Sequence, residues 1–158
     1  MVTAPVRAAD VRDEQPLPTP LAWLHTPLAE RVALIRRGVP ARWLLDTEAA
    51  MGFTRRALCD LLGIKVSTAN RKLHNNALLS HDESERLMGL HRLLGELQAL
   101  LRDCGDGTPF DAAAWLASWL QRPNQALGGE TPAAFMDTAE GREQVGRLIG
   151  AQRSGAYM

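Results

Sequence analysis

The chain has 158 residues, of which 46% are hydrophobic and 23% are charged, so it has enough apolar material for one good core or two small ones. It contains no run near the roughly 20 apolar residues that a membrane helix needs, and its first 27 residues lack the apolar stretch of a secretory signal. We therefore expect a folded cytoplasmic protein.

The formal net charge of zero hides an uneven distribution. Lys and Arg outnumber Asp and Glu by 9 to 4 in residues 28–80, whereas the counts are 2 to 3 before this segment and 7 to 11 after it. The middle segment is therefore net +5 and the last one net −4. Because a basic segment in a neutral chain localises the attraction to phosphate, one DNA-facing surface is expected within residues 28–80.

Residues 1–27 hold five prolines and few large apolar residues, so a flexible arm is expected there. From Leu28 the spacing becomes helical, with Val32 and Ile35 on the same face, and Pro40 ends this segment. No segment alternates apolar and polar residues as a strand does. The sequence therefore predicts an all-α fold.

Further helices are expected outside the basic motif described below. Residues 41–51 form the first, with core anchors at Trp43, Leu44 and Met51. The longest begins after Ser80 and Glu83, which have capping-box spacing, and continues to about Asp103. Its apolar stripe consists of Leu87, Leu90, Leu94, Leu97 and Leu101. That stripe is most simply core, but it also fits a dimer interface.

The region after residue 107 contains a third helix, whose apolar side carries Trp115, Leu116, Trp119 and Leu120. Gly128-Gly129 predicts a turn, and Thr131-Pro132 predicts the start of a short helix. Asp137 and Glu140 are expected to cap the last helix.

Residues 55–74 have the pattern of a helix-turn-helix. Two short helices that cross steeply need a small residue at the crossing, here Cys59, and a turn residue that tolerates positive φ, here Gly63. The apolar residues expected to pin both helices are Leu58, Leu62, Ile64 and Leu73. Ala69 and Lys72 stand where larger apolar residues are more usual, which leaves open a unit with weak DNA affinity.

The second helix of this motif is expected to begin at Ser67 as its cap and to face the major groove. Asn70 is suited to pairing with adenine through both groups of its amide, and Arg71 to pairing with guanine through its fork. Arg55 and Arg56 are candidate clamps on the DNA backbone. The full set of candidate DNA-binding residues is Arg55, Arg56, Lys65, Ser67, Thr68, Asn70, Arg71 and Lys72. Each of them could instead belong to a solvated face.

The C-terminal part resembles the Xre/MbcA/ParS-type antitoxins. The resemblance rests on Trp115, Trp119-Leu120, the run from Pro123 to Pro132 and the spaced residues Asp137-Thr138, Gly141, Val145, Leu148-Ile149 and Gly155. With Leu62-Gly63-Ile64 and residues 82–87 it spans about residues 28–158. It implies two domains. Residues 28–105 are expected to form an Xre-like helix-turn-helix domain that binds DNA and dimerises, and residues 106–158 a small helical toxin-binding domain.

The resemblance further implies a homodimeric antitoxin that neutralises a RES-domain, NAD-consuming toxin by direct contact and represses its own operon by binding the operator DNA. We expect the extreme C-terminus to contact the toxin, because Tyr157 and Met158 have no further chain to bury them. The candidate toxin-binding residues are Arg153, Ser154, Gly155, Tyr157 and Met158. The alternative is a frayed terminus.

No catalytic, cofactor or metal site is expected in this chain. The four histidines show no i, i+4 pairing with one another or with the two cysteines, which we expect to be free thiols. Gly128-Gly129 lacks the preceding strand and the glycine spacing of a dinucleotide site. Two other non-enzymatic functions remain open: a stand-alone helix-turn-helix transcription regulator, and an interaction protein whose helix-turn-helix serves only as scaffold.

Overall fold

The computed structural model describes residues 15–104 and 109–153, and within these ranges it contains helices and no strands. The α-helices are α1 (Pro20–His25), α2 (Leu28–Arg37), α3 (Trp43–Met51), α4 (Arg55–Leu62), α5 (Val66–His74), α6 (His81–Cys104), α7 (Ala112–Leu120) and α8 (Ala139–Arg153). Two 3₁₀ turns, η1 (Gln125–Leu127) and η2 (Pro132–Phe135), lie between α7 and α8. The all-α prediction is confirmed.

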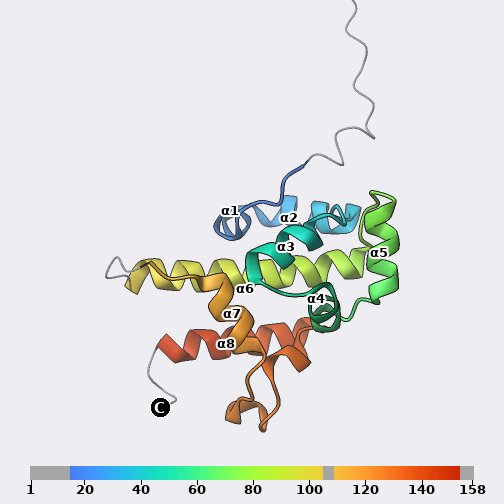
Figure 1. Ribbon diagram of the computed structural model, residues 1–158. Coiled ribbons are helices and arrows are strands. Elements are labelled where there is room, and N and C mark those ends of the chain that lie inside the picture. The colour runs from blue at the N-terminus through green and yellow to red at the C-terminus, as the bar shows by residue number, and fades with distance from the viewer. Residues whose placement is uncertain (1–14, 105–108, 154–158) are drawn as a thin grey trace, which may run out of the picture.

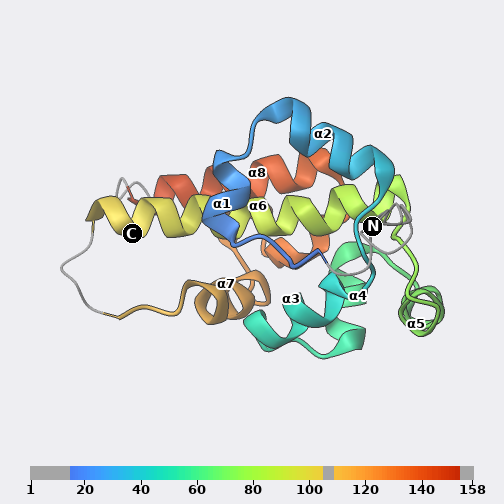
Figure 2. The same ribbon diagram turned by 90° about the horizontal axis from the view of Figure 1, so that it is seen from above.

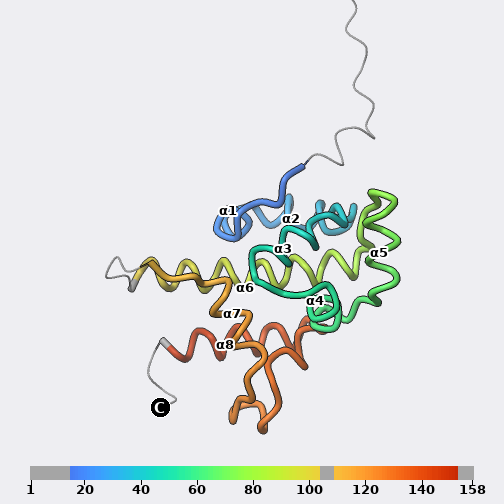
Figure 3. The backbone as a smooth tube through the Cα atoms, in the orientation of Figure 1, coloured from blue at the N-terminus to red at the C-terminus, as the bar shows by residue number. Residues whose placement is uncertain are grey.

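Helix α6 runs through the middle of the molecule, with α1 and α2 on one side and α8 on another (Figures 1 and 2). Its 24 residues span about 36 Å. The predicted capping box forms at its start, because the Ser80 N–H donates to Glu83 Oε2 (2.7 Å) and the Glu83 N–H donates to Ser80 Oγ (3.2 Å). The backbone trace shows α5 beside this N-terminal end of α6 (Figure 3).

The leucine stripe of α6 belongs to the core. Leu87 and Leu90 are fully buried, Leu94 and Leu97 are nearly so, and Leu101 is half-buried against the same cluster. Helices α1, α2, α7 and α8 all pack against α6. Within this chain the stripe is therefore covered, which favours the core interpretation over a dimer seam.

Residues 15–27 differ from the expected flexible arm. Thr19 accepts a hydrogen bond from the Ala22 N–H and caps α1, whose Trp23 is only 3% exposed. Proline fits the first turn of a helix because its missing N–H would have no partner there, so Pro20 starts α1. Gly95 allows α1 to approach α6, since a Cβ at this position would lie 2.4 Å from the Pro20 carbonyl oxygen. Residues 1–14 lie outside the described ranges.

The next two helices follow the prediction in part. Helix α2 ends before Gly38, but Leu28 is 68% exposed and α2 has no fully buried residue, because it lies on the outer side of α6. Helix α3 buries Trp43, Leu44 and Met51 as predicted. The link from α2 to α3 is fastened to the start of α6, where the Val39 N–H donates to the buried Ser84 Oγ.

The C-terminal segment packs on α6 and α3 through α7 and α8. Leu116 and Leu120 are fully buried, and Trp119, 7% exposed, stacks on half-buried Trp115 with ring centroids 5.8 Å apart. The expected cap of α8 at Asp137 and Glu140 is wrong, because the Thr138 hydroxyl accepts the hydrogen bond from the Gly141 N–H. In the described parts of the chain, no helix combines the length and the apolar character needed to cross a membrane.

Candidate functional site

Helices α4 and α5 form the predicted helix-turn-helix (Figure 1). Thr54 caps α4 by accepting a hydrogen bond from the Ala57 N–H. Gly63 has φ +63°, the left-handed conformation expected of the turn residue. Cys59 and Ala69 have no exposed surface, so small side chains stand where the two helices meet. The small Ala69 is thus a close-packing position in this motif.

The turn is held from outside the motif by α6. Arg86 Nη1 donates to the carbonyl oxygens of Leu62 (3.1 Å) and Gly63 (3.0 Å), which are among the unpaired carbonyls at the end of α4. A Cβ at Gly63 would lie 3.1 Å from Cβ of Asp137, in the loop before α8. The C-terminal segment therefore packs directly against the turn.

Helix α5 begins two residues earlier than predicted. Val66 is its first residue and Lys65 its N-cap, with φ −67° and ψ 130°, so Ser67 lies within the first turn and is not the cap. Extended backbone at Lys65 moves the start of the helix, although its side chain makes no capping hydrogen bond. The outward face of α5 carries the exposed side chains of Ser67, Asn70, Arg71 and His74.

The structure gives Arg55 two partners within the protein. Its Nε and Nη2 donate to the carboxylate of Glu48 on α3, and its Nη1 donates to Asn70 Oδ1 at 2.7 Å. The hydrogen bond with Glu48 is the main cause that raises the pKa of Arg55 above its ordinary value. Arg55 is thus fixed between three helices and is not a free clamp for the DNA backbone.

Lys72 is likewise engaged inside the protein. Its Nζ pairs with Glu83, the capping-box residue of α6, and both side chains are mostly buried at 16% and 13% exposure. Burial by itself would raise the pKa of Glu83, but the hydrogen bonds from Lys72 and Ser80 outweigh it and lower that pKa below its ordinary value. This charged residue in an unusual position of the motif therefore fastens α5 to α6.

Three predicted cations of the motif remain available. Arg56, Lys65 and Arg71 are exposed, and among the described residues none of them has an ion-pair partner. Thr68 on α5 is half-buried. The motif thus has a polar outward face on α5 and three exposed cations without an ion-pair partner among the described residues.

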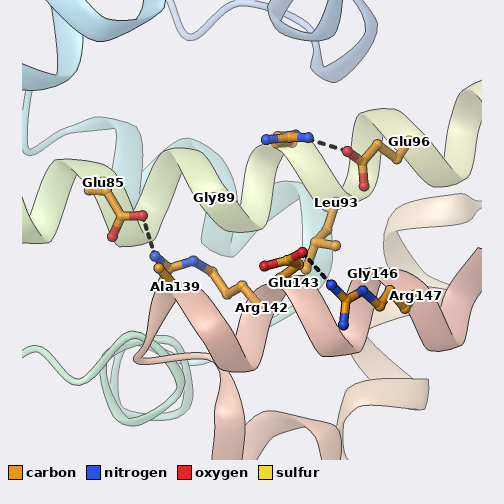
Figure 4. A pocket seen from close by; sticks show the side chains of 10 residues that line it. Glu85, Gly89, Leu93, Glu96, Ala139, Arg142, Glu143, Gly146 and Arg147 are labelled. Atoms are coloured by element: carbon orange, nitrogen blue, oxygen red, sulfur yellow. Dashed lines mark hydrogen bonds and ion pairs between the residues drawn. The ribbon is translucent and has the colours of Figure 1, made fainter.

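A second feature is the contact between α6 and α8 (Figure 4). Arg142, 6% exposed, pairs with Glu85 across the two helices and donates to the Met136 carbonyl oxygen at 2.9 Å. Beside it lies a groove of about 590 Å³ between the helices. The i, i+4 pairs Arg92–Glu96 and Arg147–Glu143 lie along its length.

The expected toxin-contacting tail lies at the limit of the described structure. Ser154, Gly155, Tyr157 and Met158 are outside the described residues, and of Arg153 only the backbone is described, as the last residue of α8. In both views the end of α8 points away from α5 along α6 (Figures 1 and 2). The helix-turn-helix and the end of α8 are therefore well separated.

Sequence reasoning missed three partners that decide the state of these arginines and lysines. Glu48 and Glu83 pair with Arg55 and Lys72, and Glu85 pairs with the buried Arg142. One signal is present in the sequence, because the capping-box spacing predicts Glu83 at the start of α6. No comparable signal relates Glu48 to Arg55 or Glu85 to Arg142, which are brought together only by helix packing.

Comparisons with known proteins agree with these two features. Residues 30–91 match the antitoxin Xre-like helix-turn-helix domain, and residues 96–155 match the antitoxin Xre/MbcA/ParS C-terminal toxin-binding domain. The two matches divide α6 between them, so one continuous helix links the two domains.

Two curated relatives cover most of the chain. The Prs ADP-ribosylating antitoxin of a Sphingobium species is 39% identical over 128 residues, which are 81% of this chain and 80% of the relative. The antitoxin Xre of Photorhabdus laumondii is 25% identical over 118 residues, which are 75% of this chain and 74% of the relative. The helix-turn-helix, the C-terminal domain packed on α6 and this similarity together establish that the chain belongs to the Xre/MbcA/ParS family of antitoxins.

Proposed function

We propose that this chain neutralises a RES-domain, NAD-consuming toxin by direct binding through its C-terminal domain and represses their shared operon through α5. The observation that carries this proposal is that one helix, α6, links two separate surfaces of the chain. An exposed polar helix flanked by free cations lies at the start of α6, and the family's toxin-binding domain packs along α6 and follows it. Each surface then serves one activity.

The relatives support the chemistry proposed for the partner. The name of the Sphingobium relative, Prs ADP-ribosylating antitoxin, couples an antitoxin with ADP-ribosylation. Transfer of ADP-ribose draws on NAD as donor, which agrees with the NAD-consuming toxin that the sequence resemblance implies. The proposal assigns this reaction to the partner toxin, and gives the present chain the role of binding and inhibiting it.

On most operators a helix-turn-helix repressor binds as two copies, so repression by this chain needs a second copy. A dimer of helix-turn-helix units places two recognition helices about one turn of DNA apart, so that each contacts one half-site. We propose a homodimer within the toxin–antitoxin complex. Its interface must use a surface other than the leucine stripe of α6, because that stripe is buried within the chain.

The test is co-expression of the chain with the protein encoded by the adjacent open reading frame. The proposal predicts that this neighbour alone arrests growth, that the chain restores growth, and that the two proteins co-purify. The purified complex should retard DNA from its own promoter, and its mass should show two copies of the chain. The toxin alone should consume NAD, and the complex should not.

Other outcomes separate the alternatives. Promoter binding without any toxic neighbour would support a stand-alone transcription regulator and contradict the antitoxin proposal. Neutralisation without DNA binding, by the chain or the complex, would leave the helix-turn-helix as a scaffold. Arg55 and Lys72 each form an ion pair with a glutamate of the same chain. This observation favours the scaffold alternative.

A further inference from the structure

The outward face of α5 has one side chain whose orientation is fixed by another helix. Asn70 is exposed at the middle of this face, between Ser67 one turn earlier and His74 one turn later. The inward face is anchored by Ala69, which has no exposed surface. Asn70 therefore occupies the centre of the surface that would enter the major groove.

The orientation of Asn70 is set by Arg55 of α4. Arg55 Nη1 donates to Asn70 Oδ1 at 2.7 Å, while the other edge of the same guanidinium is held by both carboxylate oxygens of Glu48. A planar guanidinium that is hydrogen-bonded along one edge presents its remaining N–H groups in a fixed direction. The side chains of Glu48 and Arg55 are 15% and 30% exposed, so water only partly competes for this arrangement.

This arrangement determines which atoms of the Asn70 amide remain available. A guanidinium can only donate hydrogen bonds, so the amide atom that faces Arg55 must be the oxygen, and the amino group must point the other way. Asn70 then offers donors to a DNA base. Pairing with adenine through both amide groups requires the oxygen as acceptor for the adenine N6 amino group, and Arg55 occupies one of the two lone pairs of that oxygen and fixes its direction.

We propose that Arg55 is a positioning residue, held by Glu48, which fixes the amide of Asn70 as a hydrogen-bond donor and so makes α5 prefer guanine over adenine at one operator position. Guanine presents two acceptors, N7 and O6, on its major-groove edge. Adenine presents only one acceptor there, N7, and beside it the N6 amino group, which is itself a donor. This inference rests on the proposed binding of operator DNA. It replaces two sequence-based expectations, Arg55 as a backbone clamp and Asn70 as an adenine-pairing residue.

The test is selection of binding sites from duplexes with a randomised core by the full-length protein and its variants. Asn70→Ala identifies the operator position that Asn70 contacts, because preference is lost there. At that position the unmodified protein should prefer guanine over adenine by about tenfold. Arg55→Met removes the donor, so the freed amide should turn and the preference should shift by about tenfold toward adenine.

Three further variants keep the test decisive. Glu48→Gln weakens the grip on Arg55 and should shift the preference in the same direction by a smaller factor, which carries the test if Arg55→Met fails to fold. Arg56→Met, the matched control at an exposed and unpaired cation, should lower affinity for all sequences without changing base preference. The Arg55→Met, Asn70→Ala double variant should match Asn70→Ala alone, because the two residues act as one unit.

The failures of the two proposals are distinguishable. If the unmodified protein, alone and with its toxin, selects no sequence, both operator binding and this inference are overturned. If it selects a clear motif but Arg55→Met and Glu48→Gln leave the preference at the Asn70 position unchanged, only this inference is overturned. A preference for adenine at that position in the unmodified protein would also contradict it.

Discussion

Arg71 on α5 and Arg142 on α8 carry the same guanidinium group in opposite settings. Arg71 is exposed and has no ion-pair partner among the described residues, whereas Arg142 is 6% exposed, pairs with Glu85 and donates to a backbone carbonyl. A cation without a partner can bind a phosphate or a base edge, while a buried and paired one holds two helices together. The difference teaches that the net charge of a segment predicts a binding surface only when the cations that form ion pairs within the protein are left out of the count.

The largest expected effect breaks the structural side of this comparison. Arg142→Ala removes the ion pair across α6 and α8 and leaves the Met136 carbonyl without its hydrogen bond, which should lower the free energy of unfolding by about 3 kcal/mol. Arg147→Ala, at an exposed i, i+4 pair on the same helix, should change it by less than about 0.5 kcal/mol. Urea unfolding of both variants measures this, and equal changes would contradict the account.

The next effect concerns the turn that positions the DNA-facing helix. Gly63→Val places a β-branched residue at φ +63° and forces its Cβ against Arg86 and Asp137, so stability should fall by about 2–3 kcal/mol and DNA affinity with it. Gly52→Val is the matched control, because Gly52 has φ +72° but open space around its Cβ. It should cost about 1–2 kcal/mol and leave DNA affinity intact. Full operator affinity in Gly63→Val would mean that the turn is placed wrongly.

The next prediction compares two exposed cations, one expected to contact a base and the other a phosphate. Arg71→Ala should relax base preference at one operator position by about tenfold, because a guanidinium fork recognises guanine in the major groove. Arg56→Ala should weaken binding to all sequences and flatten the salt dependence by about one phosphate contact. Titrations of specific and scrambled duplexes at several salt concentrations measure both. Identical behaviour of the two variants would remove the distinction between base and phosphate contacts.

The smallest effect concerns the titration of His91 beneath the N-terminal segment. Burial lowers the pKa of His91 below its usual value of 6.5, although hydrogen bonds to the backbone of Pro18 and Thr19 oppose this. The unfolded chain therefore binds a proton that the folded chain does not, and stability should decrease as the pH falls below about 6.5. The slope should stay under about 1.4 kcal/mol per pH unit.

His91→Gln is the matched variant, because it keeps a donor for the Pro18 carbonyl but does not titrate. Urea unfolding between neutral and mildly acidic pH should show a flatter dependence for this variant than for the unmodified chain. An unchanged slope would mean that another group causes the loss.

The sequence predicted what depends on local spacing. The capping box of Ser80 and Glu83, the turn at Gly63 and the leucine stripe of α6 all follow from residues a few positions apart. What it could not predict depends on packing between distant segments. Residues 15–27 were expected to be flexible because of their prolines, but a single buried Trp23 and the space at Gly95 dock them on α6.

The candidate site shows the same division. Its location on α4 and α5 and the exposure of Asn70 and Arg71 follow from the helix-turn-helix pattern. The pairing of Arg55 with Glu48 and of Lys72 with Glu83 joins different helices, so charge counts along the chain could not reveal which cations remain free.

The central claim, that DNA binding resides on α5 and toxin neutralisation in the C-terminal domain, is tested most directly by two variants measured in parallel. One is Arg71→Ala, and the other lacks residues 153–158, the proposed toxin-contacting tail. Each is assayed for folding, operator binding and rescue of growth from the toxin. The account predicts that Arg71→Ala rescues growth fully but binds its operator with relaxed preference, and that the truncated chain folds and binds DNA normally but fails to rescue. A truncated chain that still protects cells completely would contradict the role of the tail, and loss of both activities in Arg71→Ala would contradict the separation itself.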